Sequence, residues 1–144
     1  GRERLKARFA GQPSGPVVLA RPRQVPSADA VLLDRLRAVL DQSAEDEAFD
    51  VTALAAGAGM SRAQLHRRVK EAFGSTPAEM IIQYRLERAA HMLAQRAGNV
   101  GEVACAVGFK NVSHFVKRFR ERYGETPSSY LLSRQQATDQ ARLS

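Results

Sequence analysis

The sequence predicts an all-α fold in which two helix-turn-helix subdomains are joined by a long linker helix. Three observations support this prediction. A pattern of short helix, glycine-containing turn and longer helix occurs twice in the chain. One long helical segment separates the two copies, and no strand-like segment is long enough to matter.

The long segment begins at Thr76 and is expected to run to Ala97. Thr76 and Glu79 form a capping-box pattern around Pro77, a residue that suits the first helical position. Gly98 is expected to end the helix because glycine tolerates the left-handed conformation. About 20 residues at ~1.5 Å each make a rod of roughly 30 Å. An apolar stripe at helical spacing consists of Ile82, Leu86, Ala89, Ala90 and Leu93.

Capping residues predict the other helices. A first helix is expected from about Ala28 to Gln42, and Asp50 is placed to cap a short helix that runs through Ala58. Further starts and stops are expected at Ser61–Gln64, Phe73–Gly74, Asn99–Glu102, Asn111, Tyr123–Gly124 and Thr126–Pro127. The predicted domains are therefore a first subdomain over 28–75, a linker helix over 76–98 and a second subdomain over 99–132.

The two ends of the chain differ from this core in composition. Residues 1–27 are expected to form a basic tail and a Pro- and Gly-rich linker, and residues 133–144 a polar tail. Because the chain starts at Gly1 without Met, we expect it to be a piece of a longer protein.

Charge and cysteine content limit the classes of function. The 144-residue chain carries 22 Lys and Arg against 15 Asp and Glu, a formal net charge of +7. This excess suits a polyanion, either nucleic acid or an acidic membrane surface. No apolar run approaches the ~20 residues that span a bilayer, so no membrane insertion is expected. The single cysteine, Cys105, is expected to be buried as a small hydrophobe, and one cysteine is compatible with a reducing cytoplasm.

The two copies of the repeat align position by position. Leu54–Gly59 corresponds to Val103–Gly108 at an offset of 49, and Leu65–Pro77 corresponds to Phe115–Pro127 at an offset of 50. The extra residue falls in the turn, where an insertion is tolerated better than in a packed helix. The residues that follow the two turn glycines are expected to fill the core; they are Met60 and Phe109.

The second helix of each copy has one apolar face and one basic face. The inward positions, at ~100° per residue, are Leu65, Val69, Ala72 and Phe73 in one copy and Phe115, Phe119 and Tyr123 in the other. The outward positions match in pairs, which are Ala63 with Ser113, Arg67 with Lys117, and Lys70 with Arg120. A solvated surface helix usually mixes charges of both signs. The matched basic faces therefore favour a nucleic acid.

The major groove of DNA admits an α-helix, and the rod between the copies is close in length to the ~34 Å of one helical turn. Arg67 and Lys117 have the chemistry to donate to guanine O6 and N7, and Ala63 is small enough either to contact a thymine methyl group or to allow close approach to the DNA. The expected base contacts are Arg62, Ala63, His66, Arg67, Ser113, Val116 and Lys117. The expected phosphate contacts are Arg68, Lys70, Lys110, Arg118 and Arg120.

Simpler assignments stay open for several residues. The alternative for Arg67 and Lys117 is that they are solvated surface charges and not base contacts. His66 has no further ligand at a spacing that suits a metal site. His114 is expected to be a half-buried packing residue. Arg85, on the long helix, either holds a phosphate or pairs with an acidic group. Neither a metal nor a cofactor is expected.

Taken together, these residues resemble the AraC/XylS family of bacterial transcription regulators over roughly Leu33 to Leu132. The resemblance implies two homeodomain-like helix-turn-helix subdomains that insert recognition helices into successive major-groove segments of a direct-repeat operator. Leu131 departs from the pattern, because many members carry a basic residue there, and this puts only a peripheral phosphate contact in doubt. The motif residues are Gly108-Phe109, Ser113-His114-Phe115, Phe119, Tyr123-Gly124, Thr126-Pro127 and Tyr130, supported by Gly59-Met60-Ser61, Leu65, Phe73-Gly74, Thr76-Pro77, Arg85-Leu86, Ala89 and Leu93.

The resemblance also implies partners. It predicts a cytoplasmic transcription activator that binds double-stranded DNA, contacts RNA polymerase and receives its signal from an N-terminal signalling or dimerisation domain. The basic start and Pro-rich spacer are similar to the output end of response regulators and hybrid histidine-kinase receptors of two-component systems. A sugar-sensing or other N-terminal domain is the alternative.

Two other classes of function compete with a sequence-specific DNA-binding domain. A protein-interaction or membrane-surface module is the second hypothesis, and binding to anionic lipid without preference among DNA sequences would favour it. An enzyme is the weakest hypothesis. The sequence has no Ser/His/Asp or Cys/His set, no paired carboxylates in a pocket context and no glycine loop that cradles phosphate.

Overall fold

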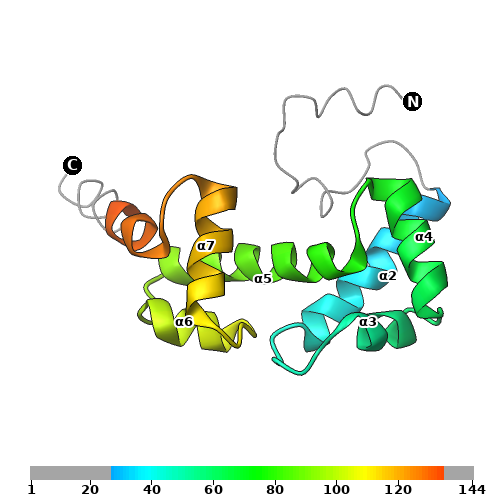
Figure 1. The fold of residues 1–144 in the computed structure, drawn as a ribbon, viewed down its shortest axis with the longest axis horizontal. Coiled ribbons are helices and arrows are strands. Elements are labelled where there is room, and N and C mark those ends of the chain that lie inside the picture. The colour runs from blue at the N-terminus through cyan, green and yellow to red at the C-terminus, as the bar shows by residue number, and fades with distance from the viewer. Residues whose placement is uncertain (1–26, 135–144) are drawn as a thin grey trace. The chain divides into compact units, whose positions relative to one another are not determined.

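The computed structural model describes residues 27–134, which are helical with short connections and contain no strand (Figure 1). The labelled helices are α2 (Ala28–Ser43), α3 (Val51–Gly57), α4 (Arg62–Phe73), α5 (Pro77–Ala94), α6 (Val100–Ala106) and α7 (Val112–Tyr123). A further helical segment covers residues 127–134. The predicted all-α class is confirmed. The expected basic tail, linker and polar tail lie outside the described residues, except for residues 27, 133 and 134.

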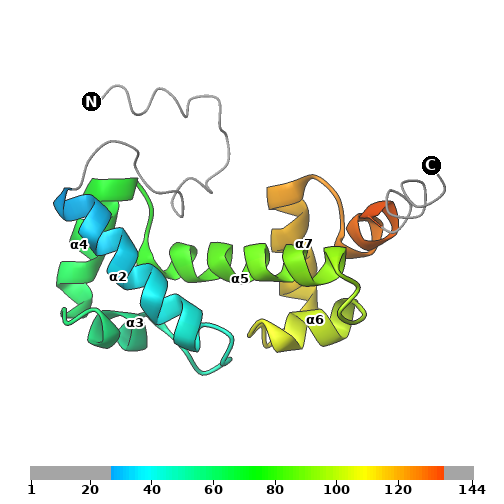
Figure 2. The ribbon, with the colours of Figure 1, turned by 180° about the vertical axis from the view of Figure 1, so that it is seen from behind.

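The described chain packs as two compact units, and α5 is continuous across the boundary between residues 83 and 84. Unit 1 contains residues 27–43 and 50–83, and unit 2 contains residues 44–49 and 84–134. The loop 44–49, which connects α2 to α3, is therefore part of unit 2. The same helices appear from behind in Figure 2.

The core of unit 1 lies among α2, α3, α4 and the first part of α5. It is made of aliphatic side chains because each helix has an apolar stripe at helical spacing. Its buried members are Leu32, Leu33, Leu36, Leu40, Leu54, Leu65, Val69, Met80 and Ile81. Ile82, predicted for the apolar stripe of the long helix, is only half-buried, and its neighbours Met80 and Ile81 are buried instead.

The core of unit 2 combines aromatic side chains with aliphatic ones such as Leu86, Leu93 and Val103. Phe115 and Phe119 of α7 are fully buried, and their ring centroids lie 5.7 Å apart. Tyr130 of the C-terminal helical segment packs edge-on against Phe119 at 5.3 Å, which anchors that segment to α7. Phe109 is buried, as expected of a residue that fills the core, whereas its counterpart Met60 in unit 1 is half-buried.

Four helix starts predicted from capping residues are confirmed. The side chains of Asp50, Ser61, Asn99 and Asn111 each accept a hydrogen bond from the backbone N–H three residues later. Reciprocal capping boxes are present at Ser61 and Asn99. The predicted helix ends at Gly74 and Gly124 are also confirmed, because both glycines adopt the left-handed conformation at φ 70° and 80°.

The predicted end of the long helix was wrong by three residues. Helix α5 ends at Ala94, and Arg96 rather than Gly98 takes the left-handed conformation just after it, at φ 56°. The N–H groups of Arg96 and Ala97 donate to the carbonyls of Leu93 at 3.1 Å and Met92 at 2.9 Å. These two bonds form a Schellman motif, so the last carbonyls are satisfied before the chain reaches Gly98.

The expected burial of Cys105 was also wrong, because this side chain is exposed. Helix α6 has only seven residues. Val103 and Ala104, with Val107 just beyond the helix, are its buried side chains. These positions recur at helical spacing and leave Cys105 on the opposite side.

Candidate nucleic-acid interface

Helix α4 presents its basic residues on the side opposite its core contacts. The capping box fixes its first turn, with Gln64 N–H donating to Ser61 Oγ at 3.1 Å and Ser61 N–H donating to Gln64 Oε1 at 3.0 Å. Leu65 and Val69 are completely buried and hold the other side of the helix in the core. Gln64 and Glu71 of this helix are also exposed. The predicted contacts that are exposed are Arg62, Ala63, His66, Arg67 and Lys70, and Arg68 is half-buried.

The first residue of α4 is tied to the preceding helix. Arg62 Nη1 donates to Thr52 Oγ1 of α3 at 3.2 Å, and both residues are exposed. This contact orients the guanidinium along the outer surface of unit 1. The guanidinium of Arg62 is thus held in a defined position beside the N-terminal turn of α4.

Helix α7 repeats this arrangement with a larger apolar anchor. Asn111 Oδ1 accepts from His114 N–H at 2.9 Å and fixes the first turn, and the buried rings of Phe115 and Phe119 hold the inner side. Ser113, Lys117 and Arg120 are exposed, and Val116 is half-buried. The structure therefore places both sets of predicted outward residues on the surfaces of their helices.

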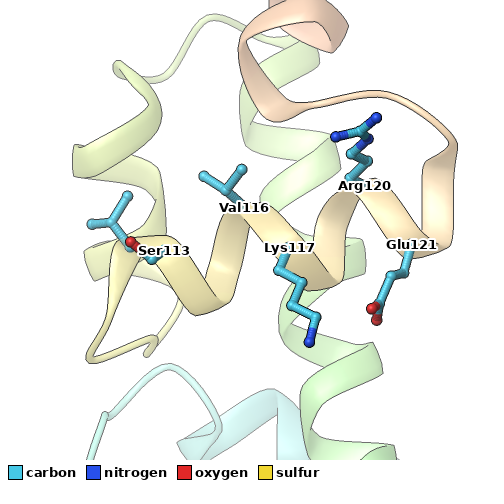
Figure 3. A pocket seen from close by; sticks show the side chains of 6 residues that line it. Ser113, Val116, Lys117, Arg120 and Glu121 are labelled. Carbon is cyan, nitrogen blue, oxygen red and sulfur yellow. The ribbon is translucent and has the colours of Figure 1, made fainter.

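An open depression follows the outer face of α7 (Figure 3). In Figure 3, Val116 and Arg120 project to one side of the helix and Lys117 and Glu121 to the other. The Glu121 carboxylate pairs with Arg118 Nε at 3.0 Å. The lining residues are Val112, Ser113, Val116, Lys117, Arg120 and Glu121.

The remaining predicted contacts lie beside these faces. Lys110 is exposed in the turn before α7, whereas the Arg118 side chain is 21% exposed and forms the ion pair with Glu121. His114 was expected to be half-buried but is exposed. Its ring packs edge-on against Phe109 at a centroid distance of 5.8 Å, so it contacts the core from outside.

Two residues of the depression, Glu121 and Val112, were absent from the predicted contacts. Val112 is the first residue of α7 and is 46% exposed, which is unusual for a large aliphatic side chain. The sequence does contain a signal for it, because Val112 and Val116 are four residues apart and share one side of the helix.

The described residues offer little for other chemistry. No group of three or more His, Cys, Asp or Glu side chains placed to hold a metal ion occurs within residues 27–134. In that same range no helix has the length and apolar character needed to cross a membrane.

A family model described as a helix-turn-helix domain matches residues 54–133. Among curated proteins, histidine kinase P4 of Formosa agariphila is 33% identical over 129 residues, covering 90% of this chain and 9% of that protein. The HTH-type transcriptional regulator MtrA of Neisseria gonorrhoeae is 38% identical over 95 residues, covering 66% of this chain and 31% of that protein. The chain thus spans less than a third of the length of either relative.

Solved structures of DNA-binding domains are also similar to this chain. The DNA-binding domain of AdpA, a global transcriptional factor solved in complex with a target DNA, matches with a TM-score of 0.66 and 31% identity, covering 76% of this chain and 96% of that one. The C-terminal domain of the two-component response regulator yesN from Fusobacterium nucleatum matches with a TM-score of 0.62 and 26% identity, covering 68% of this chain and 95% of that one.

Proposed function

We propose that α4 and α7 are the two recognition helices of this chain. The chain belongs to the AraC-type helix-turn-helix DNA-binding domains of bacterial transcription regulators. Each helix would enter one of two successive major-groove segments of a duplex. The observation that carries this proposal is the repeated outer face, with Arg67 and Lys70 on α4 and Lys117 and Arg120 on α7, all exposed. A family of DNA-binding domains does not call for an active site, so the enzyme hypothesis is set aside.

The exposed residues divide into two roles in this proposal. Base contacts come from the N-terminal halves of the helices, which are the parts that approach base edges in helix-turn-helix proteins. They are Arg62, Ala63, His66, Arg67, Ser113, Val116 and Lys117. Phosphate contacts come from the flanking cations, which supply affinity without sequence information. They are Arg68, Lys70, Lys110, Arg118 and Arg120.

Two of these roles require a side chain to exchange its present partner. Arg62 leaves Thr52, and Arg118 leaves Glu121, when they turn to the DNA. The exposed Arg62–Thr52 hydrogen bond contributes about 1 kcal/mol, so a phosphate oxygen or a guanine competes with it easily. The Arg118 side chain is only 21% exposed, so its exchange of partners also requires it to turn outward. The remaining contacts are available on the surface of the free chain.

We also propose that the chain is the output module of a two-component signalling protein. The supporting observations are the alignment to histidine kinase P4 along 90% of this chain and the similarity to the C-terminal domain of a response regulator. A signalling or dimerising domain elsewhere in the protein would bring two such modules to a direct repeat. Linking two modest sites in this way raises overall affinity through effective concentration. The module would act in the bacterial cytoplasm as an activator that contacts RNA polymerase.

Selection of binding sites from a random duplex library with the 144-residue chain tests the DNA-binding proposal. Two recognition helices acting together should enrich a bipartite site with segments about 10 bp apart. Salt titration on the winning duplex should then leave sequence preference intact while affinity falls. Enrichment of one short element alone would contradict the use of both helices. No enrichment, with binding that disappears as salt rises, would reduce the chain to a nonspecific polyanion binder.

A further inference from the structure

Two valines interrupt the polar outer face of α7. Val112 is 46% exposed and Val116, one turn later, is half-buried. Both line the open depression that also contains Lys117 and Arg120. Core packing does not account for them, because Phe115 and Phe119 already fill the inner side of this helix.

The repeat shows that these valines distinguish the two recognition helices. At the offset of 50, Val112 corresponds to Arg62 and Val116 corresponds to His66. Two outward pairs keep their charge, Arg67 with Lys117 and Lys70 with Arg120, whereas Ala63 and Ser113 differ in the opposite sense. Helix α4 thus presents hydrogen-bonding side chains at the two positions where α7 presents branched aliphatic ones.

The surroundings of the valines decide what can cover them. Lys117 and Arg120 line the same depression, and the one carboxylate there, Glu121, pairs with Arg118. A purely apolar protein segment placed there would therefore remove two cations from water without neutralising them. A DNA duplex can both neutralise the cations and cover the valines. Its phosphates are anionic, and its major groove carries isolated methyl groups. Among the four bases only thymine carries a methyl group in that groove.

We infer that α7 selects thymine, through apolar contact of Val112 and Val116 with the 5-methyl groups of its half-site. The inference rests on the proposed DNA-binding function and adds its base preference. The polar residues Arg62 and His66 at the matching positions give α4 a different preference. The two segments of the operator therefore differ in sequence although the two helices are repeats of one another.

Deoxyuridine scanning of the selected duplex tests this inference, because deoxyuridine differs from thymidine only by the 5-methyl group. Each thymine of the winning site is replaced in turn, and the affinity of the 144-residue chain is measured. One or two positions in the segment bound by α7 should each lose roughly three- to five-fold in affinity, the effect expected of one buried methyl group. A thymine that Ala63 of α4 contacts would lie in the other segment, and its effect should not respond to changes in the α7 valines.

Protein variants then show which side chains make the contact. Val112→Ala and Val116→Ala should bind the thymine duplex more weakly and should no longer distinguish it from the deoxyuridine duplex at the matching position. Val112→Thr keeps the branched shape and one of the two methyl groups, so it should retain part of the deoxyuridine effect. Val31→Ala is the matched control, since Val31 is a 55% exposed valine on α2 outside both recognition helices. It should retain the full deoxyuridine effect, and thermal melts should confirm that every variant is folded.

Two results would overturn the inference while leaving the proposed function intact. One is a sequence-specific site that tolerates deoxyuridine at every position. The other is a deoxyuridine effect that survives in Val112→Ala and Val116→Ala. A chain that enriches no sequence would instead overturn the proposed function, and thymine selection would fail with it.

Discussion

Gly108 lies so close to Arg85 that a Cβ atom added to the glycine would stand 2.7 Å from Arg85 Nε. The same added atom would stand 2.9 Å from the carbonyl oxygen of Ala44. Arg85 Nε itself donates to that carbonyl at 2.7 Å, and its Nη2 donates to the carbonyls of Asp46 at 3.0 Å and Phe49 at 3.3 Å. Within unit 2, one guanidinium therefore holds the loop 44–49 beside the turn that precedes α7.

Replacing Gly108 should destabilise the protein through this contact. Gly108 has φ 105°, which side chains rarely adopt, and the added methyl group of Gly108→Ala would overlap the Arg85 side chain and the Ala44 backbone. We expect a loss of roughly 2–4 kcal/mol in the free energy of unfolding, measured by denaturant titration.

Gly59→Ala is the matched control, because Gly59 occupies the equivalent turn of the first copy. Its φ is 75°, but nothing lies within 4 Å of the added atom. Only the backbone cost remains, about 1 kcal/mol. Equal losses for the two variants would show that the contact with Arg85 is not the cause.

Removing the Arg85 side chain should release the loop. Burial lowers the pKa of the Arg85 guanidinium, and Asp46 opposes this shift, but an arginine stays charged at neutral pH. Arg85→Ala should therefore lose about 2–3 kcal/mol of stability, because three carbonyls lose a charged donor. Arg85→Lys should recover only part, since one ammonium group does not reproduce the fork of a guanidinium.

Arg88→Ala provides the comparison for Arg85→Ala. Arg88 Nε pairs with Glu45 Oε2 at 3.2 Å, in the same loop, but both side chains are more than two-fifths exposed. Its removal should cost at most about 1 kcal/mol. Hydrogen exchange of the loop 44–49 would separate the cases, with faster exchange expected in Arg85→Ala and little change in Arg88→Ala.

Tyr123 should make the protein sensitive to high pH. Burial raises the pKa of Tyr123 to about 12; the charge of Arg122 opposes this shift and the charge of Glu87 adds to it. Because the folded pKa exceeds that of an unfolded tyrosine, about 10, the unfolded chain loses this proton first. The protonated Tyr123 therefore makes its full contribution to the free energy of unfolding below about pH 10, and this contribution is lost as the pH rises towards 12.

Tyr123→Phe removes the titrating group and should flatten the alkaline arm of a stability–pH curve. Tyr130→Phe is the control, because it removes a phenol from the same ring cluster, 5.6 Å away between centroids, and leaves Tyr123 in place. The curve should keep most of its alkaline arm in that variant, because the charge effect of Tyr130 is the smallest contribution to the raised pKa of Tyr123. An unchanged curve for Tyr123→Phe would assign the alkaline loss to other groups.

Capping residues explain why so much of the fold was predictable. A Ser, Asn or Asp placed three residues before its backbone partner is a local signal, and the starts at Asp50, Ser61, Asn99 and Asn111 needed no tertiary information. The outward faces of α4 and α7 were predictable for a related reason. Large apolar residues at helical spacing fix one side of a helix and thereby expose the other.

Features set by contacts between distant residues were not predictable. Arg85 was expected to meet a phosphate or an acid, but its hydrogen-bond partners are backbone carbonyls about 40 positions earlier in the chain, which no local pattern marks. The exposure of Cys105 depends on which side of a two-turn helix faces its neighbours. Val112 was missed because the expected contacts on α7 began at Ser113, and the exposure of the first residue of that helix is known only from its burial.

Arg96 carries a backbone cost that a pair of substitutions can measure. Its left-handed conformation costs roughly 1–2 kcal/mol for a residue with a Cβ atom, and glycine avoids that cost at a smaller entropic penalty. Arg96→Gly should therefore have a free energy of unfolding about 0.5–1 kcal/mol above that of Arg96→Ala. Arg96→Ala also removes the long side chain but keeps the Cβ atom, so the difference between the two variants isolates the backbone effect. Equal stability for both would contradict the Schellman assignment.

Arg67 and Lys117 should behave as base readers when each is replaced by alanine. Both are exposed on the outer faces of their helices, one turn from the capped start. Each variant should lose about 1–3 kcal/mol of binding free energy on the selected site and relax the preference at one base pair. Arg120→Ala is the contrasting variant, because it removes an expected phosphate contact and should weaken all sequences alike while lowering the salt slope by about 1. A uniform loss with Arg67→Ala or Lys117→Ala would make that residue a phosphate contact, and the base preference of its helix would then depend on its other outward residues.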